Sequence, residues 1–303
     1  MSLLKTNHSK IIFILNFIVS NVEKMKVKVL LENTKLENSN LCTEHGLSLF
    51  LKKDNKKILF DTGGPNGCAI NNASILGEKL SDVDFVVLSH GHNDHTGGIL
   101  KFFELNDKAP VYLKKEALNP FYSQKTHDRK FIGTNSRVSE DYFDRLKFVN
   151  NTLEIIPDVF IVPNIQKKFK VPSNNSYLLT ENENGISRDT FNHELFILIR
   201  GKKLTILSGC AHNGIKNIIS AAKDIFPNMM IKTIIGGFHL QSGSSDSLQA
   251  KDEEICDIAQ FLINENIEKV LTGHCTGDKG FNILKTVLKE KIERIYSGMD
   301  ISL

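Results

Sequence analysis

The stretch Leu88-Ser89-His90-Gly91-His92-Asn93-Asp94-His95-Thr96-Gly97-Gly98 holds three of the ten histidines of this 303-residue chain within six positions. It follows Asp84-Phe85-Val86-Val87-Leu88, an apolar run rich in valine that predicts a buried strand. Three imidazoles and a carboxylate therefore emerge where a rigid strand ends. These groups are ligands that zinc-like ions take, and the glycines give a crowded bend the backbone freedom that it needs. The stretch predicts a metal site.

The spacing within this stretch indicates two ions. His90 and His92 are two residues apart and can face one ion, while Asp94 and His95 project from the next bend toward a second ion. The alternative is a polar loop that happens to be rich in histidine. We favour the metal site, because so many potential ligands share so few positions.

Three further predicted strands end at a histidine beside glycine. Leu204–Leu207 runs into Gly209-Cys210-Ala211-His212, Ile231–Ile235 into Gly236-Gly237-Phe238-His239, and Ile267–Leu271 into Thr272-Gly273-His274. One histidine alone in such a place is more often a buried core or turn residue. Three at equivalent strand ends favour one shared site, with His212 and His274 as metal ligands and His239 as a further site residue.

These motifs resemble the metallo-β-lactamase superfamily of metallohydrolases. The resemblance rests on His-x-His-x-Asp-His after an apolar strand, on Phe60-Asp61-Thr62-Gly63, and on the three strand-end motifs above. Together they are similar to the branch that includes the archaeal synthase joining a dihydropterin to ribofuranosylaminobenzene phosphate in methanopterin biosynthesis. The match runs from about Met25 to the C-terminus, and it is specific for the branch rather than for that reaction.

The resemblance implies an α/β (α+β) fold, a four-layer αββα sandwich of two mixed sheets flanked by helices, with the metals at one edge. The pattern of strands and helices agrees and suits a single domain over residues 25–303. Residues 1–24 contain an apolar run too short to span a bilayer. We expect them to be an N-terminal extension outside this fold.

Two divalent ions are implied, zinc by preference, with manganese or iron as alternatives. The first ion is expected at His90, His92 and His212, and the second at Asp94, His95 and His274. Asp61 is implied to support the metal loop through hydrogen bonds. The implied chemistry is attack by a metal-bound hydroxide, with Asp94 orienting the nucleophile. His239 would donate a proton to the leaving group or bind a substrate phosphate.

The chain departs from the superfamily pattern at two positions. Where the family carries a histidine and then a metal-bridging aspartate, this sequence has Asp189 and Cys210. Both are additional candidate ligands, and a dinuclear centre is preferred over a mononuclear one. His45, in Glu44-His45-Gly46, either faces the metals or lies in a turn.

Residues 114–150 interrupt the strand pattern with cationic and aromatic side chains. The cationic side chains are Lys114, Lys115, Lys125, His127, Arg129, Lys130 and Arg137. One interpretation is a cap that holds an anionic or phosphorylated substrate and stacks on a flat ring. The other is a solvated surface insertion, and the sequence favours neither.

Composition narrows the partners and the compartment. The formal charge is only +3, from 38 basic and 35 acidic residues, which argues against a nucleic-acid partner. Five cysteines without a Cys-x-x-Cys pair predict no disulfide framework and fit a reducing cytoplasm. No membrane association is expected, and the oligomeric state stays open.

The preferred function is a metal-dependent hydrolase of a small anionic or phosphorylated substrate. The first alternative is a pterin-directed transferase or synthase that resembles the methanopterin-pathway enzyme. The second is a non-catalytic metal-binding sensor, which would keep the ligands without needing an open coordination position.

Overall fold

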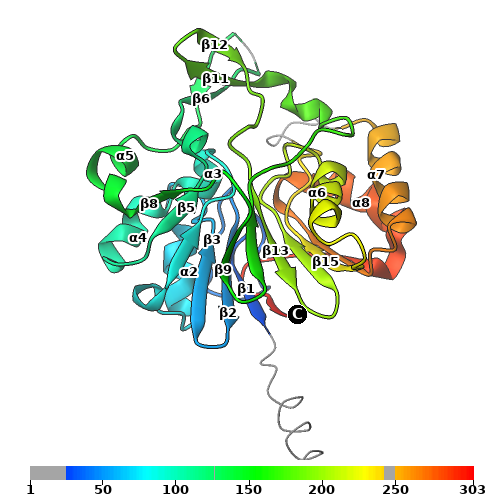
Figure 1. Ribbon diagram of the computed structural model, residues 1–303, viewed down its shortest axis with the longest axis horizontal. Helices are drawn as coiled ribbons and strands as arrows, with labels where there is room; N and C mark the ends of the chain where they lie inside the picture. The colour runs from blue at the N-terminus through cyan, green and yellow to red at the C-terminus, as the bar shows by residue number, and fades with distance from the viewer. Residues whose placement is uncertain (1–24, 126, 242–249) are drawn as a thin grey trace, which may run out of the picture.

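The computed structural model describes residues 25–125, 127–241 and 250–303, so the predicted extension 1–24 lies outside the described residues. Two seven-stranded sheets pack face to face, and helices cover their outer surfaces (Figure 1). The predicted four-layer αββα architecture is therefore confirmed.

The first sheet has the order β18-β1-β2-β3-β4-β5-β8. Its strands are β18 (Asp300–Ser302), β1 (Lys26–Leu31), β2 (Ser48–Lys53), β3 (Lys56–Phe60), β4 (Phe85–Val87), β5 (Val111–Leu113) and β8 (Leu146–Phe148). The pairs β1–β2 and β2–β3 are antiparallel, whereas β3, β4, β5 and β8 run parallel. The central strands are almost wholly apolar because both of their faces are covered.

The second sheet has the order β17-β16-β15-β14-β13-β10-β9. Its strands are β17 (Ile292–Arg294), β16 (Lys269–Thr272), β15 (Ile231–Ile235), β14 (Leu204–Leu207), β13 (Phe196–Arg200), β10 (Val159–Val162) and β9 (Leu153–Ile156). The strands β14 to β17 are parallel. Each sheet therefore has a parallel part whose carboxyl ends meet at one edge, which is where open α/β sheets place their ligands.

Side chains of both inner faces form one buried cluster between the sheets, including Val27, Leu49 and Phe60 from the first sheet and Ile197 and Ile235 from the second. On the first sheet's outer face lie α2 (Cys68–Ile75) and α4 (Ile99–Leu105), with the short helices α3 (Asn93–Thr96) and α5 (Arg137–Asp141) in adjoining loops. Short 3₁₀ turns occupy Leu80–Asp82, Lys115–Leu118, Phe143–Arg145, Ser173–Tyr177, His274–Thr276 and Lys289–Lys291.

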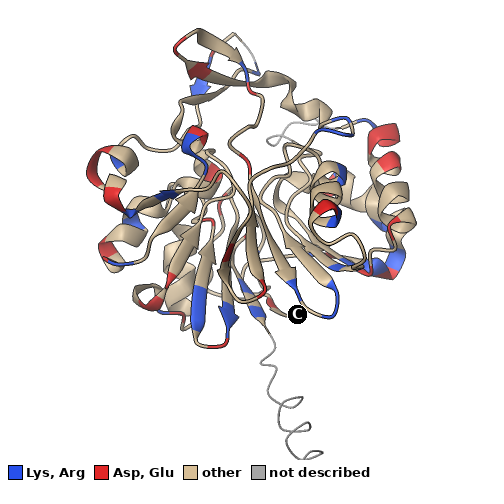
Figure 2. Cartoon of the chain, in the orientation of Figure 1, with Lys and Arg blue, Asp and Glu red and all other residues tan. Residues whose placement is uncertain are grey.

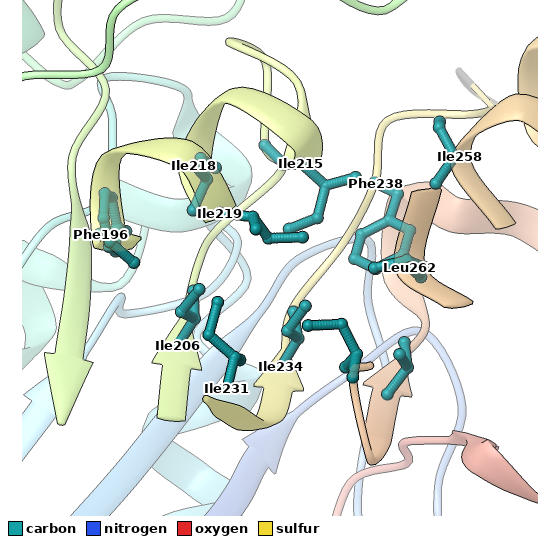
Figure 3. Close-up of a cluster of buried hydrophobic side chains, with 14 of the residues drawn as sticks. Phe196, Ile206, Ile215, Ile218, Ile219, Ile231, Ile234, Phe238, Ile258 and Leu262 are labelled. Carbon is teal, nitrogen blue, oxygen red and sulfur yellow. The ribbon is translucent and has the colours of Figure 1, made fainter. Parts of the chain in front are cut away.

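The second sheet's outer face is covered by α6 (Ile215–Ile225), α7 (Asp252–Asn264) and α8 (Gly277–Leu288). Helix α6 buries Ile215, Ile218, Ile219 and Ala222, the spacing of one face of a helix. These isoleucines pack against β14 and β15, as Figure 3 shows. This packing fixes the two strands whose ends carry site residues.

A separate four-stranded sheet, β12-β11-β6-β7, lies above the edge where the strand ends meet (Figure 1). Its strands are β6 (Phe121–Ser123), β7 (Lys130–Phe131), β11 (Leu178–Asn182) and β12 (Gly185–Arg188). We call the described residues between 121 and 131, together with 178–188, the cap. The cap differs from the predicted insertion 114–150, because β8 belongs to the first sheet and half of the cap comes from residues 178–188.

Cys42 and Cys68 form one disulfide with Cα atoms 5.5 Å apart, a cross-link that was not predicted from the sequence. Cys210, Cys256 and Cys275 are free. Within the described residues, no helix is long and apolar enough to cross a membrane. The expected reducing compartment stays a prediction.

Candidate metal centre

The predicted site residues gather at one edge of the sandwich, directly after the ends of parallel strands. Asp61 follows β3, the loop from His90 to His95 follows β4, His212 follows β14, His239 follows β15 and His274 follows β16. The structure therefore brings together residues that lie more than 200 positions apart in the sequence.

The first donor cluster contains His90, His92 and His212, whose ligand nitrogens lie within 4.8 Å of one another. All three side chains are buried, and Nε2 of each has no hydrogen-bond partner among the described residues. A buried nitrogen without a partner costs free energy. Three such nitrogens together fit a metal ion as their common partner.

The second donor cluster contains Asp94, His95, Cys210 and His274. Nε2 of His95 lies 3.1 Å from Cys210 Sγ and 3.2 Å from His274 Nε2, which is 3.3 Å from Asp94 Oδ2. Carboxylate, imidazole and thiol are ligands that zinc takes in four-coordinate sites. Cys210, one of the two additional candidate ligands, lies in this second cluster.

Four of the candidate ligand rings are held in the same way, through Nδ1. Nδ1 of His90 lies 2.8 Å from Ser89 Oγ, and Nδ1 of His95 lies 2.7 Å from Asp61 Oδ2. Nδ1 of His212 lies 3.1 Å from Asn175 Oδ1, and Nδ1 of His274 lies 3.0 Å from Asn33 Oδ1. An oxygen partner at Nδ1 orients the ring and leaves Nε2 as the donor atom toward a metal. Neither asparagine was predicted as a site residue.

Electrostatics at the two clusters favour a bound cation. Burial and the neighbouring imidazoles hold the pKa of His90 and His212 well below the ordinary value, so both rings are neutral. Although burial acts in the opposite direction, Asp61 and Asp94 raise the pKa of His95 to about 9. The carboxylates of Asp61 and Asp94 therefore favour a positive charge at the second donor cluster.

Asp61 lies fully buried beneath the second cluster. Its carboxylate accepts hydrogen bonds from Ser89 N (2.7 Å), Ser89 Oγ (2.7 Å) and His95 Nδ1 (2.7 Å). These contacts match the supporting role that the resemblance implied, and they leave the Asp61 oxygens too occupied to bind a metal themselves.

Asp189 lies in a different group, with His92 and His193. Nδ1 of His193 accepts a hydrogen bond from Gly91 N at 3.0 Å, and its Nε2 donates to Asp189 Oδ2 at 3.0 Å. Asp189 Oδ2 is 3.7 Å from His92 Nε2. His193 was not predicted as a site residue, and the signal that the sequence offers for it is its position three residues before strand β13.

Two buried glutamates that were not predicted hold the loops that carry the histidines. Glu194 accepts hydrogen bonds from His212 N at 2.6 Å and Asn213 N at 2.7 Å, and burial raises its pKa to about 7. Glu32 accepts from His274 N.

Backbone conformation at the site is unusual for non-glycine residues. Asp61, Ala211, His239 and His274 all have left-handed φ angles, of 59°, 56°, 48° and 48°. Such conformations cost free energy and persist where the surrounding structure imposes them. Here they turn the chain sharply after each strand and aim the side chains at a common centre.

A pocket of about 470 Å³ opens beside both donor clusters. Its wall includes His92, Asp94, His212 and His239 from the strand ends, and Ser123, Lys125, Lys130 and Leu178 from the cap. The cap therefore forms part of the pocket wall, and binding of an anionic substrate by the basic and aromatic segment stays a prediction.

His239 and His45 both face this pocket. Nε2 of His239 lies 3.5 Å from the Tyr177 hydroxyl, and its ring centroid lies 4.2 Å from that of His212. Nε2 of His45 is 3.3 Å from Asp94 Oδ2. His45 therefore faces the site rather than only a turn.

An αββα sandwich with two donor clusters at its strand ends defines a candidate metalloprotein of the metallo-β-lactamase fold. Residues 43–172 match the family model for the metallo-beta-lactamase superfamily. A solved structure described as a metal-dependent hydrolase of the beta-lactamase superfamily, Tm1679, is 31% identical with a TM-score of 0.75, covering 92% of this chain and 99% of that one. This chain belongs to the metallo-β-lactamase superfamily.

Two further relatives were found. The 7,8-dihydropterin-6-methyl-4-(beta-D-ribofuranosyl)-aminobenzene-5'-phosphate synthase of Methanocaldococcus jannaschii is 27% identical over 296 residues, 92% of this chain and 97% of the synthase. The metallo-beta-lactamase fold protein YhfI of Bacillus subtilis shares the fold, with 13% identity, a TM-score of 0.53 and coverage of 93% of this chain and 100% of YhfI. The resemblance to the branch that includes the synthase is confirmed.

Proposed function

We propose that the protein is a metal-dependent hydrolase of a small anionic or phosphorylated substrate. The observation that carries the proposal is the first donor cluster, where the buried Nε2 atoms of His90, His92 and His212 have no hydrogen-bond partner among the described residues. The similarity to a structure described as a metal-dependent hydrolase supports it. The partner is a small molecule rather than a nucleic acid, and the expected compartment is the cytoplasm.

The donor atoms fit two divalent ions. His90, His92 and His212 would hold the first, and Asp94, His95, Cys210 and His274 the second. A thiol in the second set favours zinc over manganese. When bound, two such ions supply a water nucleophile near neutral pH and polarise the bond under attack.

The chain's own side chains then orient the reactants and move protons. Asp94 borders the pocket, where its carboxylate can orient the attacking group. His239 borders the same pocket and contacts Tyr177, so it can donate a proton to the leaving group. The cap limits the access of bulk water.

The alternative is a pterin-directed synthase. The similarity to the synthase of Methanocaldococcus jannaschii extends over 92% of this chain, which favours it. The pocket of about 470 Å³ is large enough for a bicyclic ring. Quenching of pterin fluorescence by the protein separates the two functions, because the hydrolase need not bind pterin.

A turnover assay tests the proposed hydrolase. We expect the zinc-loaded protein to hydrolyse bis(4-nitrophenyl) phosphate or a related diester, and His92→Ala to abolish turnover. Asn192→Ala, at an exposed position, is the matched control and should keep it. Unchanged turnover in His92→Ala would rule out the proposal. A protein that binds metal but neither turns over a substrate nor binds pterin would favour the sensor.

A further inference from the structure

Two cationic side chains of the cap lie in the pocket wall. Lys125 follows β6, and Lys130 begins β7, so both belong to the cap and line the same pocket as His92 and Asp94. In the part of the chain that the structure describes, neither ammonium group forms an ion pair. Figure 2 shows basic residues on the cap above the strand ends.

The other cations of residues 114–150 do not share this position. Arg137 pairs with Asp141 at 2.9 Å, and Lys114 lines a different pocket together with Glu194. Lys115 and Arg129 do not line the pocket beside the donor clusters. Two of the seven predicted cations, Lys125 and Lys130, therefore line this pocket.

The surroundings of this pair favour an anion. Partial burial and then the charge of Lys130 lower the pKa of Lys125, and a bound anion would relieve both effects. The Lys125 Nζ lies 5.1 Å from the centroid of the Tyr177 ring, a cation–π contact that holds it in the wall. Asp128 supplies one carboxylate to the pocket, and Ser123 supplies a hydroxyl.

We infer that Lys125 and Lys130 bind a phosphate group of the substrate that is separate from the bond under attack. The inference rests on the proposed function and narrows its substrate class to an ester or diester with an additional phosphate monoester. Residues of the donor clusters form the part of the pocket wall at the strand ends, and the two lysines form part of the wall on the cap. A substrate that spans the pocket would therefore contact both the donor clusters and the lysines. Lysine ammonium groups bind phosphate as point charges, and two of them can balance the charge of a dianionic phosphate monoester.

A pair of substrates tests this inference. One is a nucleoside 4-nitrophenyl phosphodiester, and the other is the same compound with a separate terminal phosphate. We compare kcat/KM for both in the wild-type protein, in Lys125→Ala/Lys130→Ala, and in the control Lys115→Ala/Arg129→Ala, which removes the same charge from outside the pocket. All four positions are exposed, so the fold should tolerate each change.

We expect the wild-type protein to prefer the phosphorylated substrate. Loss of two charge-assisted contacts should reduce this preference about tenfold or more in Lys125→Ala/Lys130→Ala and leave it unchanged in the control. An equal preference in all three proteins would overturn the inference.

Calorimetric titration of the same three full-length proteins with inorganic phosphate gives a second test that does not need turnover. We expect the wild-type and control proteins to show a phosphate-binding event that is absent from the titration of Lys125→Ala/Lys130→Ala. If the wild-type protein hydrolyses neither substrate, the proposed function fails, and the titration still decides the phosphate site. Identical binding curves in all three proteins would contradict the site whatever the activity.

Discussion

Oδ2 of Asp61 lies 2.7 Å from Nδ1 of His95, and the same carboxylate accepts two hydrogen bonds from Ser89. Asp61 directly follows strand β3, and Ser89 and His95 belong to the segment after β4. One buried carboxylate thus joins two neighbouring strand ends and directs Nε2 of His95 toward Cys210 and His274.

Asp61→Asn should weaken the second metal position. The amide nitrogen would replace an oxygen that now faces two donors, from Ser89 and His95. We expect metal affinity at this position to fall about 10- to 100-fold and the free energy of unfolding by about 1–3 kcal/mol. Competition with a chelator measures the affinity. Ser48→Ala is the control, because the Ser48 hydroxyl donates a hydrogen bond to the Asp61 backbone carbonyl and not to its carboxylate. Equal affinity in both variants would contradict the role of the carboxylate.

His193→Phe should weaken the first metal position selectively. The substitution keeps an aromatic ring beside Phe121, whose centroid lies 4.1 Å away, but it removes the hydrogen bonds to Gly91 and Asp189. We expect the metal content to fall from two ions toward one, since the loop between His90 and His92 loses its support. Elemental analysis after dialysis measures this, and a content equal to that of wild type would show that His193 is dispensable.

Gly209→Ala should disturb both donor clusters at once. A Cβ atom at Gly209 would lie 2.2 Å from Ser89 Oγ and 3.1 Å from His90 Nδ1. The clash would displace Ser89 from Asp61 and cost about 1–3 kcal/mol, which chemical denaturation measures. Gly201→Ala is the control because its closest neighbour is 3.5 Å away. An equally small loss in the free energy of unfolding for both substitutions would argue against tight packing between Gly209 and Ser89.

Asp84→Asn should reveal a pH-dependent contribution at the start of β4. Burial raises the pKa of Asp84, but hydrogen bonds from Lys57 N and Lys56 Nζ outweigh it and lower the pKa below the ordinary 3.8. A carboxyl with a lowered folded-state pKa stabilises the fold above pH 3.8 and loses this effect as the pH falls through the folded-state value. We expect the free energy of unfolding of the wild-type protein to be roughly 1 kcal/mol higher than that of Asp84→Asn at pH 7.

Denaturation of both proteins from pH 7 to pH 2 tests this prediction. The difference in the free energy of unfolding should shrink as the pH falls below about 4. A difference that stays constant with pH would show that the ionised form of Asp84 does not matter.

The parts of the site that could be predicted are those that follow buried strands. His90, His212, His239 and His274 each come a few residues after an apolar run and have glycine nearby, so one local pattern located all four. The four-layer fold followed from the same pattern of strands and helices, read with the family resemblance.

The remaining parts depend on contacts between distant segments. The cap pairs Leu179 with Tyr122 and Thr180 with Phe121, and no local pattern indicates which strands meet across that separation. Cys42 and Cys68 form no recognisable motif. Asn33 lies two residues after the end of β1, so it could have been predicted if amides as well as histidines at strand ends had been considered.

Metal content per chain tests the central claim most directly. The full-length protein is purified without added metal, incubated with zinc, dialysed and measured by elemental analysis beside His90→Ala/His92→Ala. Two donor clusters predict about two equivalents of zinc in wild type and about one in the variant. About one equivalent in both proteins, or none in a folded wild-type chain, would contradict a dinuclear centre.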